Sequence, residues 1–381
     1  MNFEFATTTR IIFGAGKLQE IGATAKPFGR RALVVIGKSA KAIQRAEPLL
    51  QLLTNAGIEY ATFSVSGEPT FDIVRTGTAS TRDERCEFVI SFGGGSVIDT
   101  GKAVAALVTN GGDPLDYVEI VGKGQPLTKP SAPFIAIPTT AGTGSEVTRN
   151  AVLGAPEQRL KVSLRSAEML PRVALVDPEL TYDLPPNITA TSGLDALTQL
   201  IEPFVSVKAN PMVDAICREG MHRVARSLRR AFEQGDDPAA RADMALAALF
   251  SGMALANAGL GAVHGLAGPI GGMFDAPHGA LCAALLPHVM EVNRGMIRGP
   301  AGRGAVSAPT EIVGRFNEVR RIVGDLDELV RALRIPPLRQ YGVKREHFAT
   351  IIEKAKATSS MKGNPLPLRD EELRKILEHA L

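Results

Sequence analysis

Cysteine is scarce in this sequence, and its spacing argues against two classes of protein. The 381 residues include three cysteines, Cys86, Cys217 and Cys282, and no two of them form a C-x-x-C pair. An odd and widely spaced set argues against a disulfide framework and against a thiolate zinc site. We therefore expect a protein of the reducing cytoplasm.

An excess of charge of one sign is also lacking. The formal net charge of +3 is too small for this length to indicate a nucleic-acid partner. The first residues, MNFEFATTTRIIFG, have no basic segment followed by an apolar segment, so we predict no secretory signal. We expect the partners to be small molecules, with no role for nucleic acid or membrane.

One long run, from Met244 to Met273, carries no charged residue and has the length of a membrane span. The run contains seven glycines, an asparagine and a histidine, which favour two buried helices in a protein core instead.

The length predicts two domains, because single cores usually stop growing at about 250–300 residues. We predict an α/β domain over residues 1–183 and an all-α helical domain over 184–381. In the first domain, apolar runs alternate with helical patterns, as in a parallel sheet covered on both faces. Later segments lie closer together, as hairpins do, and are expected to add strands to the sheet. The expected β-rich runs are 31–37, 59–65, 86–96, 134–140, 148–154, 160–166 and 173–180.

Alanine and leucine periodicity dominates after about residue 188 and predicts successive helices. The clearest helical stretches are 239–258, 309–330 and 346–357. The short run 298–309, rich in Gly, Ala, Arg and Pro, is expected to be a surface loop or a disordered piece.

Two loops that follow apolar strands are rich in glycine and hydroxyl groups. The first, SFGGGSVIDTGK, places Gly94, Gly95 and Ser96 where a helix begins, and backbone N–H groups there bind phosphate well. The second, PTTAGTGSEVT, supplies hydroxyl donors. Together they favour a shared nucleotide over two ordinary turns. The hydroxyl groups of the second loop belong to Thr139, Thr140, Thr143 and Ser145.

His264 and His278 lie in an apolar, glycine-rich stretch, where an imidazole usually has a specific task. Asp195 and Gln199 are four residues apart on a predicted helix, so they share a face. An aspartate with two histidines is a familiar site for Fe²⁺ or Zn²⁺. His288 is expected to pack or to support the site, and the remaining histidines lie among charged residues at predicted surface positions: His222, His347 and His379.

Five motifs, in this order, resemble signatures of the iron-containing (group III) alcohol dehydrogenase family: GGGSVIDTGK, PTTAGTGSEVTRNAV, VALVDPEL, GLDALT and PHGALCAALLPHVMEVN. The resemblance covers nearly the whole chain. It implies a dehydroquinate synthase-like architecture, in which a dinucleotide-binding α/β domain precedes a helical domain, with NAD(P) and a divalent metal, Fe²⁺ or Zn²⁺, in the cleft between them. It also implies that Gly94, Gly95, Ser96 and Asp99 lie at the cofactor phosphates, and that Thr139, Thr140, Thr143, Ser145 and Lys161 line the rest of the groove.

The family binds its metal with one Asp and three His, and this chain departs from that pattern. Asp195, His264 and His278 match three ligands, whereas Gln199 stands where the remaining histidine is expected. We expect Gln199 to complete the ligand set of Asp195, His264 and His278 through its side-chain oxygen, which is a neutral and weaker ligand than imidazole. Gly268 replaces a further histidine of the family, which removes a proton relay and opens space beside the substrate.

Cofactor choice depends on the end of an early strand, where family members that favour NAD often carry an acidic residue. Here Gly37, Lys38 and Ser39 occupy that place. The same residues mimic the end of a Walker A motif, but Ala32 stands where that motif needs glycine. Since Lys38 and Ser39 suit a 2′-phosphate, the sequence favours NADP over NAD.

The resemblance predicts a cytoplasmic, metal-dependent oxidoreductase that transfers a hydride between NAD(P) and an alcohol, aldehyde or ketone, and that forms a homodimer or larger oligomer. Asp195, His264 and His278 would act in catalysis through the metal. Two alternatives stay open. One is a metal-independent reductase resembling the maleylacetate reductases, favoured by Gln199 and Gly268, and the other is a nucleotide-binding protein without catalytic turnover.

Overall fold

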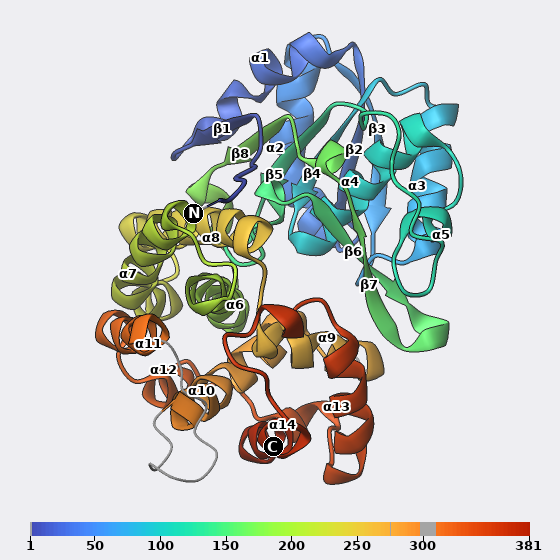
Figure 1. The fold of residues 1–381 in the computed structure, drawn as a ribbon. Helices are drawn as coiled ribbons and strands as arrows, with labels where there is room; N and C mark the ends of the chain where they lie inside the picture. The colour runs from blue at the N-terminus through green and yellow to red at the C-terminus, as the bar shows by residue number, and fades with distance from the viewer. Residues whose placement is uncertain (1, 275, 298–309) are drawn as a thin grey trace. The chain divides into compact units, whose positions relative to one another are not determined.

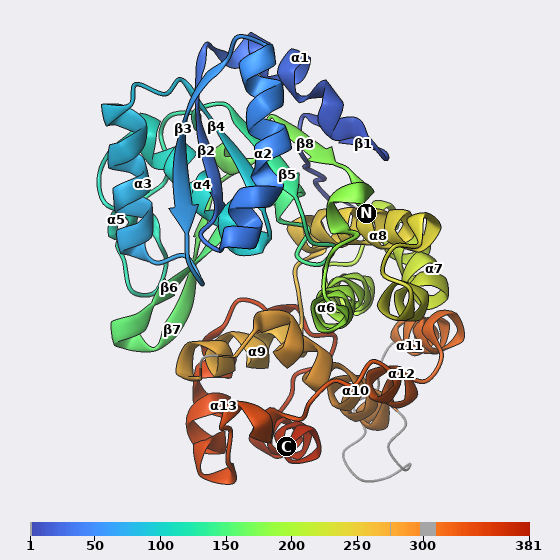
Figure 2. The same ribbon diagram turned by 180° about the vertical axis from the view of Figure 1, so that it is seen from behind.

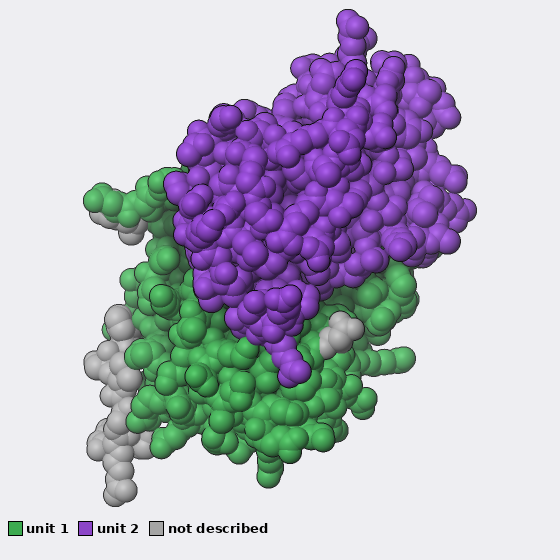
Figure 3. Space-filling view, turned by 90° about the vertical axis from the view of Figure 1, so that its right-hand side faces the viewer, with its two compact units in different colours: residues 1–6, 141–143, 183–381 green, residues 7–140, 144–182 purple. Residues whose placement is uncertain are grey.

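The computed structural model describes residues 2–274, 276–297 and 310–381, and the chain forms two compact units. The first comprises Asp183–Leu381 with Ala141–Thr143 and the N-terminal residues up to Ala6. The second comprises Thr7–Thr140 and Gly144–Tyr182. Figure 3 colours them separately. The predicted N-terminal domain, residues 1–183, thus differs from the second unit, because its first residues and Ala141–Thr143 pack with the helical unit.

A six-stranded, all-parallel sheet forms the centre of the α/β unit, in the order β1-β8-β5-β4-β2-β3. Along β2, Leu33 and Val35 join one buried cluster while Val34 and Ile36 join another, because alternate side chains point to opposite faces. Helices α1 and α2 cover one face, and α3 and α4 cover the other (Figures 1 and 2). The strands are β1 (Arg10–Phe13), β2 (Arg31–Gly37), β3 (Glu59–Val65), β4 (Phe88–Gly93), β5 (Phe134–Pro138) and β8 (Val173–Val176), and the helices are α1 (Ile21–Ala25), α2 (Ala40–Asn55), α3 (Phe71–Asp83), α4 (Gly95–Asn110) and α5 (Pro114–Tyr117).

The prediction that the later segments all extend this sheet is wrong for two of them. β6 (Asn150–Ala155) and β7 (Leu160–Arg165) form a separate antiparallel ribbon, whereas β8 inserts between β1 and β5. The β6–β7 connection is too short for a crossover, so these strands can pair only as a hairpin. β3 also differs from the expected fully apolar strand, because it is an edge strand with several exposed side chains.

The helical unit contains nine α-helices in its described part. Asn210 and Asp237 cap α7 and α8 by accepting hydrogen bonds from the backbone N–H groups of Val213 and Ala240. The helices are α6 (Pro186–Val205), α7 (Pro211–Glu233), α8 (Pro238–Ala258), α9 (Ala262–Met273), α10 (His278–Ile297), α11 (Thr310–Val323), α12 (Leu326–Ala332), α13 (Phe348–Ala357) and α14 (Asp370–Ala380). The short 3₁₀ helices of both units are Lys17–Glu20, Lys26–Phe28, Ser145–Val147, Pro156–Gln158, Ala167–Met169, Pro178–Thr181, Leu338–Tyr341, Arg345–His347 and Met361–Gly363.

The long uncharged run divides between α8 and α9, as two helices rather than one. By length and composition α8 is the one described helix that could cross a membrane, but 61% of its apolar window is buried inside the protein. The predicted helix 309–330 is also divided, because Gly324 adopts a positive φ and Asp325 caps α12. Its first residue and the predicted loop 298–309 lie outside the described residues.

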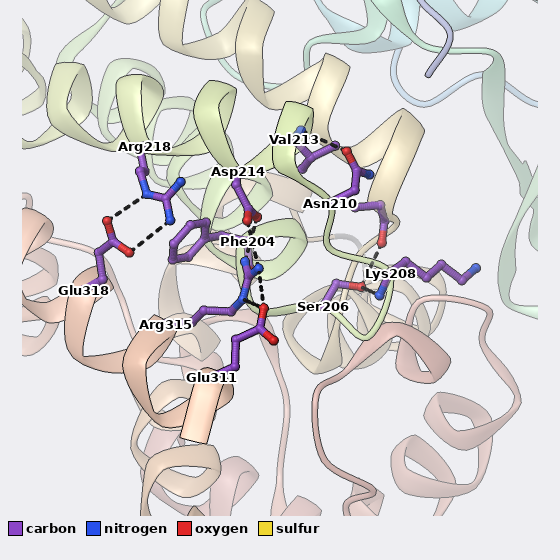
Figure 4. A network of polar contacts seen from close by, with 11 residues as sticks. Phe204, Ser206, Lys208, Asn210, Val213, Asp214, Arg218, Glu311, Arg315 and Glu318 are labelled. Carbon is purple, nitrogen blue, oxygen red and sulfur yellow. Dashed lines mark hydrogen bonds and ion pairs between the residues drawn. The ribbon is translucent and has the colours of Figure 1, made fainter. Parts of the chain in front are cut away.

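Arg315 connects α11 with α6 and α7 through hydrogen bonds (Figure 4). Its guanidinium donates to both carboxylate oxygens of Asp214, at 2.6 and 2.8 Å, and to the carbonyl oxygen of Phe204 at 2.7 Å. Arg218 pairs with Glu318 at 2.8 Å. Both guanidinium groups lie over the Phe204 ring, 5.0 and 5.1 Å from its centroid, so one aromatic side chain joins two ion pairs.

Candidate functional site

Three helices of the helical unit bring Asp195, His264 and His278 together. Asp195 lies on α6, His264 on α9, and His278 is the first residue of α10. The Oδ1 atom of Asp195 is 3.4 Å from His264 Nε2 and 3.8 Å from His278 Nε2. These three groups and the thiol of Cys282 offer one ligand atom each, all within 4.8 Å of one another.

Two of these ligand atoms are buried and unpartnered. Asp195 is 2% exposed and His264 is 7% exposed. Among the described residues, neither Asp195 Oδ1 nor His264 Nε2 has a hydrogen-bond partner. Leaving a buried polar atom unsatisfied costs about 1–3 kcal/mol, and more for a charged group. A cation bound between the carboxylate oxygen and the imidazole nitrogen would give both atoms a partner. These residues therefore fit a divalent metal.

Glu202 holds His264 in place. Its Oε2 atom is 2.6 Å from His264 Nδ1, and its Oε1 accepts a 2.7 Å hydrogen bond from the backbone N–H of Val263. A carboxylate acceptor at Nδ1 places the proton there and leaves the lone pair of Nε2 for a metal. The sequence interpretation missed Glu202. Its spacing was a usable signal, because Asp195, Gln199 and Glu202 follow one another at four and three residues on one helix face.

The electrostatics of the cluster favour an ionised aspartate. Burial raises the pKa of Asp195, but His264, His278 and Gln199 outweigh burial and bring the pKa below its ordinary value. Asp195 therefore carries a negative charge at neutral pH, as a metal-binding carboxylate must.

Gln199 lies in the same buried region, and its side chain is already engaged. It is 3% exposed, and its Oε1 atom accepts a hydrogen bond from Ser251 Oγ at 3.2 Å. Its side chain also lowers the pKa of the Asp195 carboxyl. At Gly268 on α9, an added Cβ would meet no described atom within 4 Å.

Cys282 joins the cluster from α10, one helical turn after His278. Its Sγ atom is 3.6 Å from His278 Nε2, and the cysteine is fully buried. The sequence interpretation did not include it, although the spacing of four residues from His278 was visible. The other histidines lie elsewhere. His222 and His379 are exposed, while His288 and His347 are partly buried and do not belong to this cluster.

The proposed nucleotide loops lie at the carboxyl ends of adjacent strands in the α/β unit. β2 and β4 are neighbours, but the chain runs from β2 to β3 on one side and from β4 to β5 on the other, which makes this a topological switch point. Gly37 ends β2, and the exposed Lys38 and Ser39 follow, with Ser39 capping α2. Ligands of such sheets bind in the crevice outside these strand ends.

The glycine loop and the first threonines lie side by side. Gly94 caps α4, whose first turn contains Gly95 and Ser96. The N–H of Thr139 donates to the carbonyl oxygen of Gly93 at 2.9 Å, and an added Cβ on Gly94 would lie 3.4 Å from Thr140 Oγ1. Backbone N–H groups at the start of α4 and the threonine hydroxyl groups therefore border the same place.

The remaining predicted cofactor residues have internal partners. Asp99 is buried and accepts hydrogen bonds from Ser145 Oγ and, at 2.9 Å, from the N–H of Val152. Lys161 pairs with Glu68 at 2.9 Å. Thr143 belongs to the helical unit rather than to the α/β unit. Asp99 therefore shapes the loop through Ser145.

A buried lysine supports the same loop and was missed from sequence. Lys102 Nζ donates to the carbonyl oxygens of Ser145 and Asn150, at 2.8 and 2.7 Å, and to Thr148 Oγ1 at 2.8 Å. Burial lowers the pKa of Lys102 to about 8, against the opposing charges of Asp99 and Glu146. The buried ammonium group of Lys102 thus connects the loop that carries Ser145 with the start of β6.

Comparison with known proteins gives matches along the chain. Residues 8–178 match the iron-containing alcohol dehydrogenase model, and residues 189–381 match the C-terminal model of the Fe-containing alcohol dehydrogenase family. The chain is 35% identical to 1,3-propanediol dehydrogenase of Klebsiella pneumoniae, covering 99% of this chain and 98% of that protein. It is also 35% identical to alcohol dehydrogenase 4 of Saccharomyces cerevisiae, strain YJM789, covering 97% and 96%.

Solved structures agree with these matches. A 1,3-propanediol oxidoreductase structure superposes with a TM-score of 0.89 at 33% identity, covering all of both chains. A sulfoacetaldehyde reductase from Bifidobacterium kashiwanohense, solved with NAD⁺, gives a TM-score of 0.85 at 28% identity, covering 100% of this chain and 99% of that chain.

Proposed function

Because the chain belongs to the iron-containing alcohol dehydrogenase family and is therefore a metal-dependent oxidoreductase acting on alcohols, we propose that Asp195, His264 and His278 hold its metal ion. Family membership implies NAD(P) as the hydride carrier and a small alcohol or aldehyde as the substrate. The observation that carries the assignment of residues is the pair of buried, unpartnered ligand atoms, Asp195 Oδ1 and His264 Nε2.

When bound, a divalent metal supplies Lewis acidity at the substrate oxygen. Residues of the chain provide the charge and the ligand orientation that metal binding requires. Asp195 contributes a negative charge in a region that excludes water, and Glu202 fixes the orientation of His264. The side chain of His278 is 33% exposed, so this side of the cluster is open to an incoming substrate. In a metal-independent reductase, Asp195 Oδ1 and His264 Nε2 would stay buried without a hydrogen-bond partner, at a cost of about 1–3 kcal/mol.

The α/β unit supplies the nucleotide site in this proposal. The N–H groups at the start of α4, around Gly94 and Ser96, bind the pyrophosphate, with Thr139 and Thr140 beside them. Asp99 acts indirectly, because a carboxylate repels phosphate and here holds Ser145. The exposed Lys38 at the switch point binds the 2′-phosphate, which favours NADP over NAD.

Gly268 sets the size of the substrate in this proposal. The family's histidine is absent there, and an added Cβ would meet no described atom within 4 Å. Substrates bulkier than a short alcohol are therefore accommodated. We further propose that the enzyme acts in the cytoplasm as a homodimer or larger oligomer.

The test is removal and return of the metal. Protein stripped with a strong chelator should lose NAD(P)-linked oxidation of a panel of alcohols and regain it with Zn²⁺ or Fe²⁺. His264→Ala protein should bind no metal and show no turnover. Full activity in metal-free protein would overturn the proposal in favour of the metal-independent reductase, and nucleotide binding without turnover on any substrate would favour the non-catalytic alternative.

A further inference from the structure

We propose that the thiolate of Cys282 is the fourth protein ligand of this metal ion, in place of the family's missing histidine, and that the site is therefore a zinc site. The inference rests on the proposed function, which assigns the metal to Asp195, His264 and His278. It adds a residue of a different chemical type, which the family pattern of one Asp and three His does not contain.

The distances fit a tetrahedral arrangement. With zinc bonds of about 2.3 Å to sulfur and about 2.0–2.1 Å to nitrogen or oxygen, tetrahedral ligands lie about 3.6 Å apart for a sulfur–nitrogen pair and about 3.4 Å apart for a nitrogen–oxygen pair. Cys282 Sγ is 3.6 Å from His278 Nε2. His264 Nε2 is 3.4 Å from Asp195 Oδ1, and His278 Nε2 is 3.8 Å from the same oxygen. The other three pairs of ligand atoms lie within 4.8 Å of one another.

The helices explain how a cysteine reaches this place. His278 and Cys282 are four residues apart on α10, so both side chains project from one face. An added Cβ on Gly279 would lie 2.7 Å from the carbonyl oxygen of Thr191 and 3.5 Å from the Asp195 Cβ, which shows how closely α10 approaches α6 here. Glycine at 279 permits this approach, and the approach brings the sulfur to Asp195.

Gln199 is a poorer candidate for the fourth position. Its oxygen accepts a hydrogen bond from Ser251 at 3.2 Å, and its side chain lowers the pKa of the Asp195 carboxyl. As a neutral amide oxygen, it is also a weaker ligand for Zn²⁺ than a thiolate. We assign Gln199 as a positioning residue that orients the Asp195 carboxylate.

The softness of a thiolate favours the same assignment. Thiolate ligands select Zn²⁺ over the harder metals, and the sequence argument against a site built from several thiolates does not apply to a single thiolate beside histidine and carboxylate.

The experiment uses the full-length protein, stripped of metal and titrated with Co²⁺ as a spectroscopic probe. We expect a sulfur-to-cobalt charge-transfer band in the near ultraviolet that saturates at one ion per chain and is displaced by Zn²⁺. Cys282→Ser should abolish the band and weaken Zn²⁺ binding by more than the roughly 10–100-fold that loss of an outer partner costs. Cys86→Ala removes the half-exposed thiol of the α/β unit and should leave both the charge-transfer band and the Zn²⁺ affinity unchanged. Gln199→Leu should leave the charge-transfer band in place.

A second measurement needs no variant. X-ray absorption of the zinc-loaded wild-type protein should show one sulfur neighbour at about 2.3 Å. Cobalt or zinc bound without sulfur, or a charge-transfer band that survives in Cys282→Ser, would overturn the role of Cys282 while leaving the proposed function intact. Wild-type protein that takes up neither Co²⁺ nor Zn²⁺ would overturn both.

Discussion

Glu202 Oε2 lies 2.6 Å from His264 Nδ1, and both side chains are almost completely buried. The carboxylate comes from α6 and the imidazole from α9, so this contact fixes one histidine of the cluster against the helix that carries Asp195. A histidine held in this way presents Nε2 in one orientation, so its side chain loses less conformational entropy when a metal binds.

Glu202→Gln should weaken metal binding by about 10–100-fold, because the neutral amide is a poorer acceptor for the Nδ1 proton and makes Nε2 less basic. Competition with a chromophoric chelator measures the Zn²⁺ affinity. Glu233→Gln, on the exposed end of α7, is the matched control and should bind as the wild type does. Unchanged affinity in Glu202→Gln would show that Glu202 only packs against His264.

Lys38→Ala should change the choice of cofactor. Loss of a charged hydrogen bond costs about 1.5–3 kcal/mol, so kcat/KM for NADPH should fall by at least about tenfold, with little change for NADH. Steady-state kinetics with each cofactor measure the ratio. Lys375→Ala, an exposed lysine on α14, should leave the ratio unchanged. Equal losses with both cofactors would indicate that Lys38 does not contact a 2′-phosphate.

Glu146→Gln should stabilise the protein in a pH-dependent manner. Burial raises the pKa of Glu146 to about 7, against its own backbone N–H and Lys102. Between the unfolded value of 4.5 and the folded value of about 7, the native state binds more protons than the unfolded state, so stability falls as pH rises through this window.

The variant cannot titrate, so its advantage over the wild type should grow from near zero at about pH 4 to on the order of 3 kcal/mol at about pH 8. Urea midpoints across this range measure it. A constant difference between the two proteins at every pH would contradict the assignment of this proton to Glu146.

Arg315→Met should destabilise the helical unit by about 3 kcal/mol, because it leaves the Asp214 carboxylate buried without its partner. Only 14% of the Arg315 side chain and 11% of the Asp214 side chain is exposed. Adding Asp214→Asn should recover part of the loss, since the unpaired charge is then gone. Urea unfolding measures both, and Arg321→Met, whose side chain is 76% exposed, is the control. Similar effects at 315 and 321 would refute a special role for this ion pair.

Much of this protein could be predicted from local patterns in its sequence. Continuous apolar runs identified β2, β4 and β5, and glycine and hydroxyl residues after them marked the loops at the strand ends, because parallel strands end at one edge of a sheet. The spacing of Asp195 and Gln199 correctly placed both on one helix. Family motifs added the expectation of a metal and NAD(P).

Only the tertiary structure decided which side chains meet. Helical spacing shows which residues share a face, but it does not show which faces pack together. The contact of Glu202 with His264, and the place of Cys282 beside Asp195 and His264, therefore could not be predicted from spacing alone. In the same way, the pairing of β6 with β7 and the insertion of β8 between β1 and β5 depend on connections and long-range contacts. The sequence determined the ligand types that are available, and the close approach of α10 to α6 placed the thiol of Cys282 in the cluster with Asp195.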